Sequence, residues 1–203
     1  MAVKGASRLR AAMWPTIAAL GAITVLAGLG TWQVQRLHWK ESLIAERDAR
    51  LAAPPIAIEE ATPAVEFRRV RVAGRFVEGR AIFLESRVNP KGEAGYHLVM
   101  PLLLTSGATV WVDRGWVRGR SVPPASGEAV IEGVVRRGGK PSAWMPDNDP
   151  AHNIWFFVDA PFFIDTNPPP EIVNNHLQYV ITWYGLALAC AAIYGAFVWR
   201  RLR

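Results

Sequence analysis

Residues 174–199 read NNHLQYVITWYGLALACAAIYGAFVW, and none of the 23 side chains from Leu177 to Trp199 carries a formal charge. A second charge-free stretch, of 25 residues, runs from Ala11 to Gln35. An α-helix rises about 1.5 Å per residue, so ~20 apolar residues cross the ~30 Å hydrocarbon core of a bilayer. The sequence therefore predicts two membrane-spanning helices, over residues 13–34 and 177–199.

The residues that flank these two runs predict their orientation. Trp and Tyr side chains, which favour the bilayer interfaces, lie toward the ends of both runs: Trp14, Trp32, Tyr179, Trp183, Tyr184 and Trp199. Unbalanced Lys and Arg lie in the tails, residues 1–12 and 200–203, and positive residues stay in the cytoplasm. We therefore expect both termini in the cytoplasm, residues 35–176 in the periplasm, and the bacterial inner membrane as the location. A cleaved signal peptide is the alternative for the first run, but its apolar length exceeds the roughly 7–15 residues of a signal core.

The distribution of charge argues against a nucleic-acid-binding protein. The formal net charge of +6 and the pI near 10.0 suggest a polyanion partner. All 17 acidic residues, however, lie between Glu41 and Glu171, and 17 Lys and Arg lie between Arg36 and Lys140. The centre is therefore neutral and only the tails are basic, which leaves no basic face for nucleic acid.

The segment between the two runs is expected to start as a helix and continue as strands. Residues 36–52 lack Pro and Gly and have helical apolar spacing, which predicts a helical stalk. Short segments separated by turn residues then predict strands at 67–72, 74–77, 81–85, 96–104, 109–117, 129–136 and 155–158. We expect residues 65–158 to form an antiparallel β-rich core, barrel- or sandwich-like, and residues 159–176 to form an irregular return loop.

The search for catalytic patterns favours a protein that is not an enzyme. The stretch from Gly133 to Lys140 resembles a phosphate-binding loop, but the Lys comes one position late and Pro141 stands where a helix would begin. The sequence contains no Gly-x-Ser-x-Gly elbow, and no two of its four His are four residues apart. We expect surface or packing roles for His97 and His152.

His176 stands at the outer end of the second apolar run. Ionisable side chains at membrane depth are costly and often mark functional sites, and neutral imidazole is a common axial ligand of haem iron. On a helix, Tyr179, Val180 and Trp183 follow His176 on one face and would form an aromatic and apolar wall beside its ring. The alternative is an interfacial His that hydrogen-bonds a carbonyl or a lipid headgroup, among aromatic residues of the interface.

Six blocks of sequence, spread over nearly the whole chain, carry a family pattern. They read GTWQVQR at 30–36, FRRVRVAGRF at 67–76, GYHLVMP at 95–101, VDRGWV at 112–117, PDNDPAHNIW at 146–155 and NNHLQYVITWYGLA at 174–187. In this order, between two membrane anchors, they resemble the surfeit locus protein 1 family of cytochrome c oxidase assembly factors. The sequence departs from that pattern at residues 159–174, which are fewer and richer in Pro than the family leads us to expect.

The resemblance implies a non-enzymatic role in building haem-copper cytochrome c oxidase. It implies binding of haem a at the outer membrane level, with His176 as the axial ligand of the iron. The haem would be delivered to, or retained for, the catalytic subunit of the oxidase, and haem a synthase is a further expected partner. Two alternatives stay open: an oxidase chaperone that acts by protein contacts alone and binds no haem, and a membrane-anchored enzyme whose site includes Asp147, Asp149 or His152.

Three further residues are candidates for contact with haem propionates or with the oxidase. Arg114 ends a strand segment, and its guanidinium can hold a carboxylate bidentately or form a structural ion pair. Trp32 and Arg36 lie one turn apart where the first helix leaves the membrane, so they can instead be an aromatic anchor and a snorkelling cation.

Small residues in both apolar runs predict close packing of the two membrane helices. Gly21 and Gly28 in the first run would face Gly185 and Ala189 in the second, which would bring Trp32 and His176 to the same level. The sequence leaves open the second haem ligand, the haem stoichiometry, the oligomeric state and the oxidase that is served.

Overall fold

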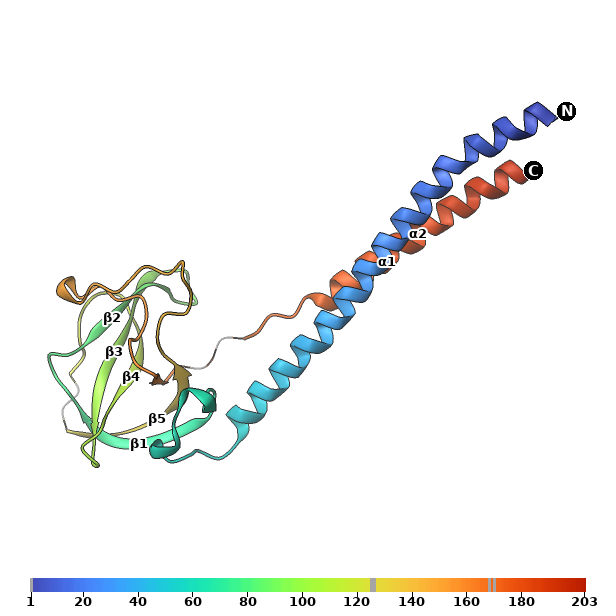
Figure 1. Ribbon diagram of the computed structural model, residues 1–203. Coiled ribbons are helices and arrows are strands. Elements are labelled where there is room, and N and C mark those ends of the chain that lie inside the picture. The colour runs from blue at the N-terminus through green and yellow to red at the C-terminus, as the bar shows by residue number, and fades with distance from the viewer. Residues whose placement is uncertain (1, 125–126, 168, 170) are drawn as a thin grey trace. The chain divides into compact units, whose positions relative to one another are not determined.

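The computed structural model describes residues 2–124, 127–167, 169 and 171–203. These residues fall into two compact units. The helix unit comprises Met1–Ala45 and Glu171–Arg203, and the sheet unit comprises Glu46–Pro170. The long helices are α1 (Ala2–Ala52) and α2 (His176–Leu202), and α1 ends two residues before Pro54-Pro55, which cannot continue it (Figure 1).

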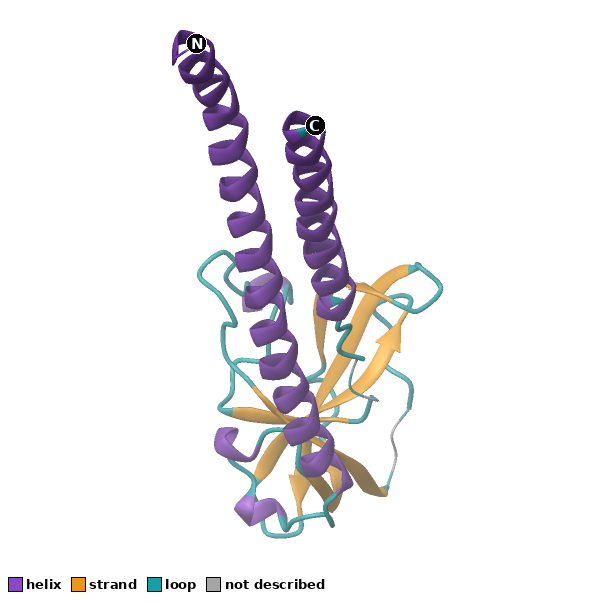
Figure 2. Cartoon of the chain, turned by 90° about the vertical axis from the view of Figure 1, so that its right-hand side faces the viewer, coloured by secondary structure: helices purple, strands orange, loops and turns teal. Residues whose placement is uncertain are grey.

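The two helices pack along one line of positions, which we call the helix seam. Its α1 positions are less exposed than their neighbours: Thr16, Ala19, Ile23, Leu26, Gly30, Gln33, Leu37, Lys40 and Ile44. Its α2 positions are His176, Val180, Trp183, Ala187, Cys190, Tyr194 and Phe197. This alternation of three- and four-residue steps is the spacing with which two helices keep one face toward each other. The helices accordingly lie side by side, with both chain termini at the same end of the pair (Figure 2).

Hydroxyl groups hold the pair in antiparallel register. Thr16 Oγ1 lies 2.7 Å from Tyr194 Oη, and Thr31 Oγ1 lies 3.0 Å from Tyr184 Oη. Residue numbers rise along α1 as they fall along α2, as an antiparallel pair requires. Each bond joins two hydroxyls that meet only in this register, so it favours this register over a shifted one.

The expectation that Gly21, Gly28 and Gly185 allow close helix packing is wrong. A Cβ added at any of these three positions would have no atom within 4 Å. The glycine that faces a bulky neighbour is Gly30, where a Cβ would stand 3.0 Å from the Tyr184 ring. Gly30 belongs to the helix seam, whereas Gly21, Gly28 and Gly185 are exposed.

Both helices contain segments that are long and apolar enough to cross a membrane, Met13–Ala52 and His176–Arg201. Within their most apolar windows only 11% and 6% of the residues are buried. Helices that are apolar yet mostly exposed are typical of lipid-facing segments, because a soluble core would cover such side chains.

The sheet unit is built on one mixed sheet of six strands. They are β1 (Arg69–Phe76), β2 (Ile82–Val88), β3 (Ala94–Leu104), β4 (Thr109–Val117), β5 (Glu128–Arg137) and β6 (Phe162–Asp165). The strand order is β1-β5-β6-β4-β3-β2, and β1 also pairs with β3 through residues 74–76 and 102–104. Three short 3-10 helices lie in the connections: η1 (Ile58–Glu60), η2 (Pro63–Val65) and η3 (Pro150–His152).

This single mixed sheet corrects the expected antiparallel barrel or sandwich. β6 pairs in parallel with β4, through Val112–Ile164 and Asp113–Asp165, and antiparallel with β5. β4 and β5 run in opposite directions, so any strand inserted between them must be parallel to one of the two. The mixed character therefore follows from where the returning chain enters the sheet.

Two segments of the returning chain also differ from the sequence-based expectation. Residues 155–158 are not a strand, and Trp155 makes only an isolated bridge with Leu84. β6 lies instead within residues 159–176, which were expected to be irregular.

Alternating side chains build the core of the sheet unit. Along β1 the buried Val70, Val72 and Phe76 alternate with the exposed Arg71 and Arg75. The buried face joins the main hydrophobic cluster, whose most buried large members are Leu98, Met100, Leu102 and Ile164. A smaller cluster on the other face contains Ile82, Leu84, Val99 and Val158.

Candidate functional site

His176 is the first residue of α2, and its ring is oriented by a residue of α1. His176 Nδ1 lies 2.7 Å from Gln33 Oε1. An amide oxygen only accepts hydrogen bonds, so Nδ1 carries the hydrogen, and the neutral ring then has its lone pair on Nε2. Among the described residues Nε2 has no hydrogen-bond partner. Metal-binding His residues usually have this arrangement: a neighbouring group accepts a hydrogen bond from one ring nitrogen and fixes the tautomer, while the other ring nitrogen is left free for the metal.

Gln33 lies at the helix seam, and its side chain is the positioning group. The residue is only 8% exposed, one of two buried polar or charged residues in the described part of the chain. One heptad further along α1, Lys40 Nζ donates to the carbonyl of Val173, just before α2 begins. These two contacts tie His176 and the residues just before it to α1. Gln33 was not predicted as a site residue from the sequence, although an uncharged polar side chain in an apolar helix indicates a buried hydrogen bond.

Of the three residues expected to form a wall beside His176, two lie on the helix seam. Val180 and Trp183 follow His176 at seam positions, whereas Tyr179 is 51% exposed. Trp183 Nε1 is buried and has no hydrogen-bond acceptor among the described residues. A buried indole N–H without an acceptor is costly, because most buried Trp side chains find a hydrogen-bond partner.

Trp32 and Arg36 lie together on an exposed part of α1, with a third residue that the sequence analysis missed. The Arg36 guanidinium carbon lies 5.7 Å from the centroid of the Trp32 ring and 4.9 Å from that of Trp39. Arg36 forms no ion pair with the described residues. Its charge is therefore available to an anion, while the two rings hold its guanidinium in place. Trp39 was detectable because it lies three residues after Arg36, on the same face of a helix.

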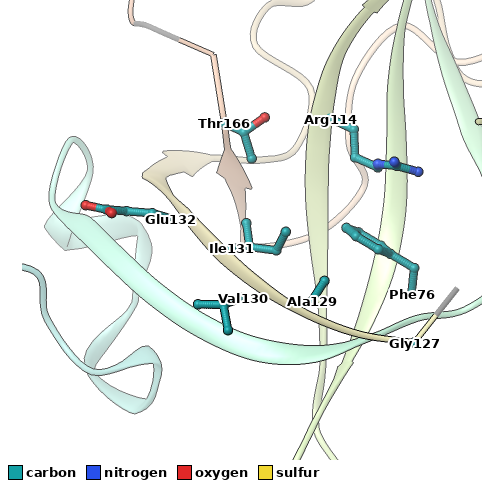
Figure 3. Close-up of a pocket in the computed structure, with 8 residues that line it drawn as sticks. All are labelled: Phe76, Arg114, Gly127, Ala129, Val130, Ile131, Glu132 and Thr166. Atoms are coloured by element: carbon teal, nitrogen blue, oxygen red, sulfur yellow. The ribbon is translucent and has the colours of Figure 1, made fainter. Parts of the chain in front are cut away.

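Arg114 belongs to the sheet unit, on β4. Its Nη1 donates to Met100 Sδ and to the carbonyl of Pro123, both at 3.3 Å, and its guanidinium carbon lies 4.8 Å from the Phe76 ring centroid. No described residue forms an ion pair with Arg114, so the structural ion pair considered from the sequence is not found there. Arg114 and Phe76 line a cavity of about 450 Å³ (Figure 3).

The other polar cluster of the sheet unit is built from His97 and two carboxylates. His97 Nδ1 lies 2.7 Å from Asp113 Oδ2, and the Gly115 N–H donates to Asp113 Oδ1 at 2.8 Å. Asp165 is the register partner of Asp113 on β6. Burial raises the pKa of Asp165, and the nearby Asp113 charge raises it further, while hydrogen bonds from Asn167 lower it.

His152 pairs with Asp149 Oδ2 at 2.6 Å on the surface. In the described part of the chain no group of three or more His, Cys, Asp or Glu could hold a metal ion.

Comparison with known proteins places the chain in a family. Its sequence matches the SURF1 family over residues 20–188. Mouse surfeit locus protein 1 is 34% identical in an alignment that covers 82% of this chain and 70% of the mouse protein. SURF1-like proteins of Monosiga brevicollis and Rickettsia felis are 31% and 28% identical, over 87% and 84% of this chain and 85% and 91% of their own lengths. The resemblance stated from the sequence is therefore confirmed, and the chain belongs to the SURF1 family.

Proposed function

We propose that this protein is a non-catalytic assembly factor for haem-copper cytochrome c oxidase, which binds haem a and delivers it to, or retains it for, the catalytic subunit. The observation that carries the proposal is the His176–Gln33 hydrogen bond, which leaves His176 Nε2 free to bind iron. Family membership supports the assembly role.

The residues of the helix unit fit a haem in three respects. His176 would hold the haem iron through its free imidazole nitrogen. Trp183 contributes a buried N–H that lacks an acceptor, and Arg36 contributes a cation without a protein counter-ion. Haem carries an apolar ring and carboxylate groups, so one helix pair offers a partner for each part. Arg114 lies in the other unit and is not needed for this proposal.

The proposed location is the bacterial inner membrane, with both termini in the cytoplasm and the sheet unit in the periplasm. The support is the exposure of the apolar faces of α1 and α2, together with the basic tails. His176, at the start of α2, would then lie at the outer membrane level.

The assembly role is tested in a haem a-producing bacterium whose own family member has been deleted. We expect the wild-type chain and His38→Ala to restore oxidase activity, because His38 is an exposed residue of α1 outside the helix seam. His176→Ala should leave oxidase with a lower haem a content per catalytic subunit. Full restoration by His176→Ala, at equal amounts of protein in the membrane, would contradict the proposal.

A second function, an oxidase chaperone that binds no haem, is favoured by one surface feature. Trp144 is 96% exposed, and large aromatic residues presented in this way are typical anchors of protein interfaces. In that case His176→Ala would restore oxidase, and only Trp144 variants would fail.

A further inference from the structure

We propose that the cavity beside Arg114 is a binding site for a carboxylate attached to an apolar body. This site is separate from the proposed haem site and does not depend on it. We call it the Arg114 cavity, and its lining includes Phe76, Arg114, Ala129, Ile131 and Thr166 (Figure 3).

The cavity exists because β6 is short. β6 runs between β4 and β5 only from Phe162 to Asp165, where Asp165 pairs with Asp113 on one side and Val134 on the other. Thr166 then ends the strand, because its N–H and its hydroxyl both donate to the carbonyl of Asp113. Beyond this point no strand separates Arg114 on β4 from the first half of β5, and the space of about 450 Å³ opens there.

The base of the cavity is apolar. Phe76 is 6% exposed and belongs to the main hydrophobic cluster, which Ala129 and Ile131 also pack against. In Figure 3 the Arg114 guanidinium lies above the Phe76 ring, with Ala129 and Ile131 on the neighbouring strand. An occupant would therefore gain free energy by bringing an apolar group against these side chains.

The charge of the cavity is positive and incompletely compensated. Arg114 is half-buried, and its hydrogen bonds from Nη1 go to a sulfur and a carbonyl, neither of which carries a charge. Another half-buried guanidinium of the sheet unit, that of Arg136, lies 3.5 Å from carboxylate oxygens of both Glu66 and Asp165. The carboxylate of Glu132, which also lines the cavity, is paired with Arg69.

The remaining Arg114 donors define the class of ligand. Nε and Nη2 have no partner among the described residues, and a guanidinium presents such donors in a fork that matches a carboxylate. The contacts to Pro123 and Phe76 hold the guanidinium in one orientation, which lowers the entropy lost on binding. The chemistry is that of a carboxylate on an apolar body, as a free organic acid supplies it.

The test uses the full-length protein in detergent and two fluorinated probes of equal shape. 4-(4-Fluorophenyl)butyrate carries the carboxylate, and 4-(4-fluorophenyl)butanamide is its neutral counterpart. Binding is followed by fluorine NMR, with protein-free detergent as the blank. We expect the acid to bind about tenfold or more tightly than the amide, because only the carboxylate forms a hydrogen bond with the guanidinium in which both partners are charged.

Matched variants assign that preference to Arg114. Arg114→Gln should bring the affinities of acid and amide close together, while Arg75→Gln, an exposed Arg on β1, should leave the preference unchanged. Ala129→Leu keeps the charge of Arg114 and fills the apolar base of the cavity, so it should weaken the binding of both probes alike. This variant also keeps the test decisive if Arg114→Gln does not fold. Equal binding of both probes to the wild type, or a preference that survives Arg114→Gln, would overturn the proposal.

A second arm tests whether the cavity is separate from the proposed haem site. The acid probe is titrated into protein from a host that makes haem a and into protein from a host that does not. Equal binding of the probe to both preparations is expected. Weaker binding to the haem-loaded protein would overturn the claim that the two sites are separate.

Discussion

At the scale of single residues, the central feature is a polar pair within an otherwise largely apolar helix seam. Gln33 and His176 are 143 positions apart in the chain and 2.7 Å apart in the structure. Burying two polar side chains costs free energy that the hydrogen bond between them only partly offsets. What the pair provides is a fixed tautomer and ring orientation. That is the property a metal-binding imidazole needs, and packing alone would not supply it.

Asp165 offers a residue-level prediction about pH. Burial raises its pKa above 3.8, so the folded chain binds the Asp165 proton more tightly than the unfolded chain. Its contribution to the free energy of unfolding is therefore greatest below pH 3.8 and is lost as the pH rises through the raised pKa. Relative to Asp165→Asn, we expect the wild type to lose stability over this window, measured by urea unfolding of the full-length protein in detergent.

Asp149 is the matched control, because its pKa is shifted the other way. The hydrogen bond from His152 lowers the pKa of Asp149. Relative to Asp149→Asn, the wild type should therefore gain stability as the pH rises through that lowered pKa. A wild-type advantage over Asp165→Asn that grows with pH would contradict the account of Asp165.

At the scale of elements, the close approach of α1 and α2 depends on Gly30. Gly30→Leu should force the Tyr184 ring away, break its hydrogen bond with Thr31 and destabilise the helix pair by about 1–3 kcal/mol. The measurement is the free energy of unfolding of the full-length protein in detergent. Gly21→Leu is the control, because a Cβ at Gly21 would have no atom within 4 Å. Equal stabilities of the two variants would show that the pair does not depend on Gly30.

The elements that the sequence predicted are those with a local signal. The charge-free runs indicated α1 and α2, and the pattern at 109–117 predicted β4 with its observed bounds. β6 was missed because four residues, FFID, carry no alternation, and only their pairing with β4 and β5 makes them a strand. Trp155 was expected in a strand, but it forms only an isolated bridge beside Leu84.

The residues of the candidate site also fall into those with a local signal in the sequence and those without one. His176 could be selected from its position at the end of an apolar run, because that signal is local. Gln33 could not be assigned to it, because the contact depends on the register between two helices at opposite ends of the sequence. Gly30 was overlooked for the same reason: nothing near it in sequence indicates that the Tyr184 ring faces it.

At the scale of the whole molecule, a change at Trp144 can distinguish haem binding from contact with a partner protein. The loop that presents it is held by the Lys140–Asp147 ion pair at 2.6 Å and by the Asn148 side chain, which bonds the Phe156 N–H at 2.9 Å. Trp144→Ala should therefore lower oxidase assembly at least several-fold, as loss of an interface hot spot does, without changing the haem spectrum. Val88→Ala, at another exposed apolar residue, is the control. Normal oxidase assembly with Trp144→Ala would contradict the prediction that Trp144 contacts a partner protein.

The most direct test of the central claim is the absorbance spectrum of the full-length protein, purified in detergent from a host that makes haem a. We predict a haem a spectrum for the wild type and for His38→Ala, and its loss in His176→Ala. Gln33→Leu should weaken haem binding about 10- to 100-fold, whereas Gln33→Glu should retain it, because a carboxylate also accepts the Nδ1 hydrogen. A haem-free wild type, or an unchanged spectrum in His176→Ala, would contradict the claim that His176 binds the haem iron.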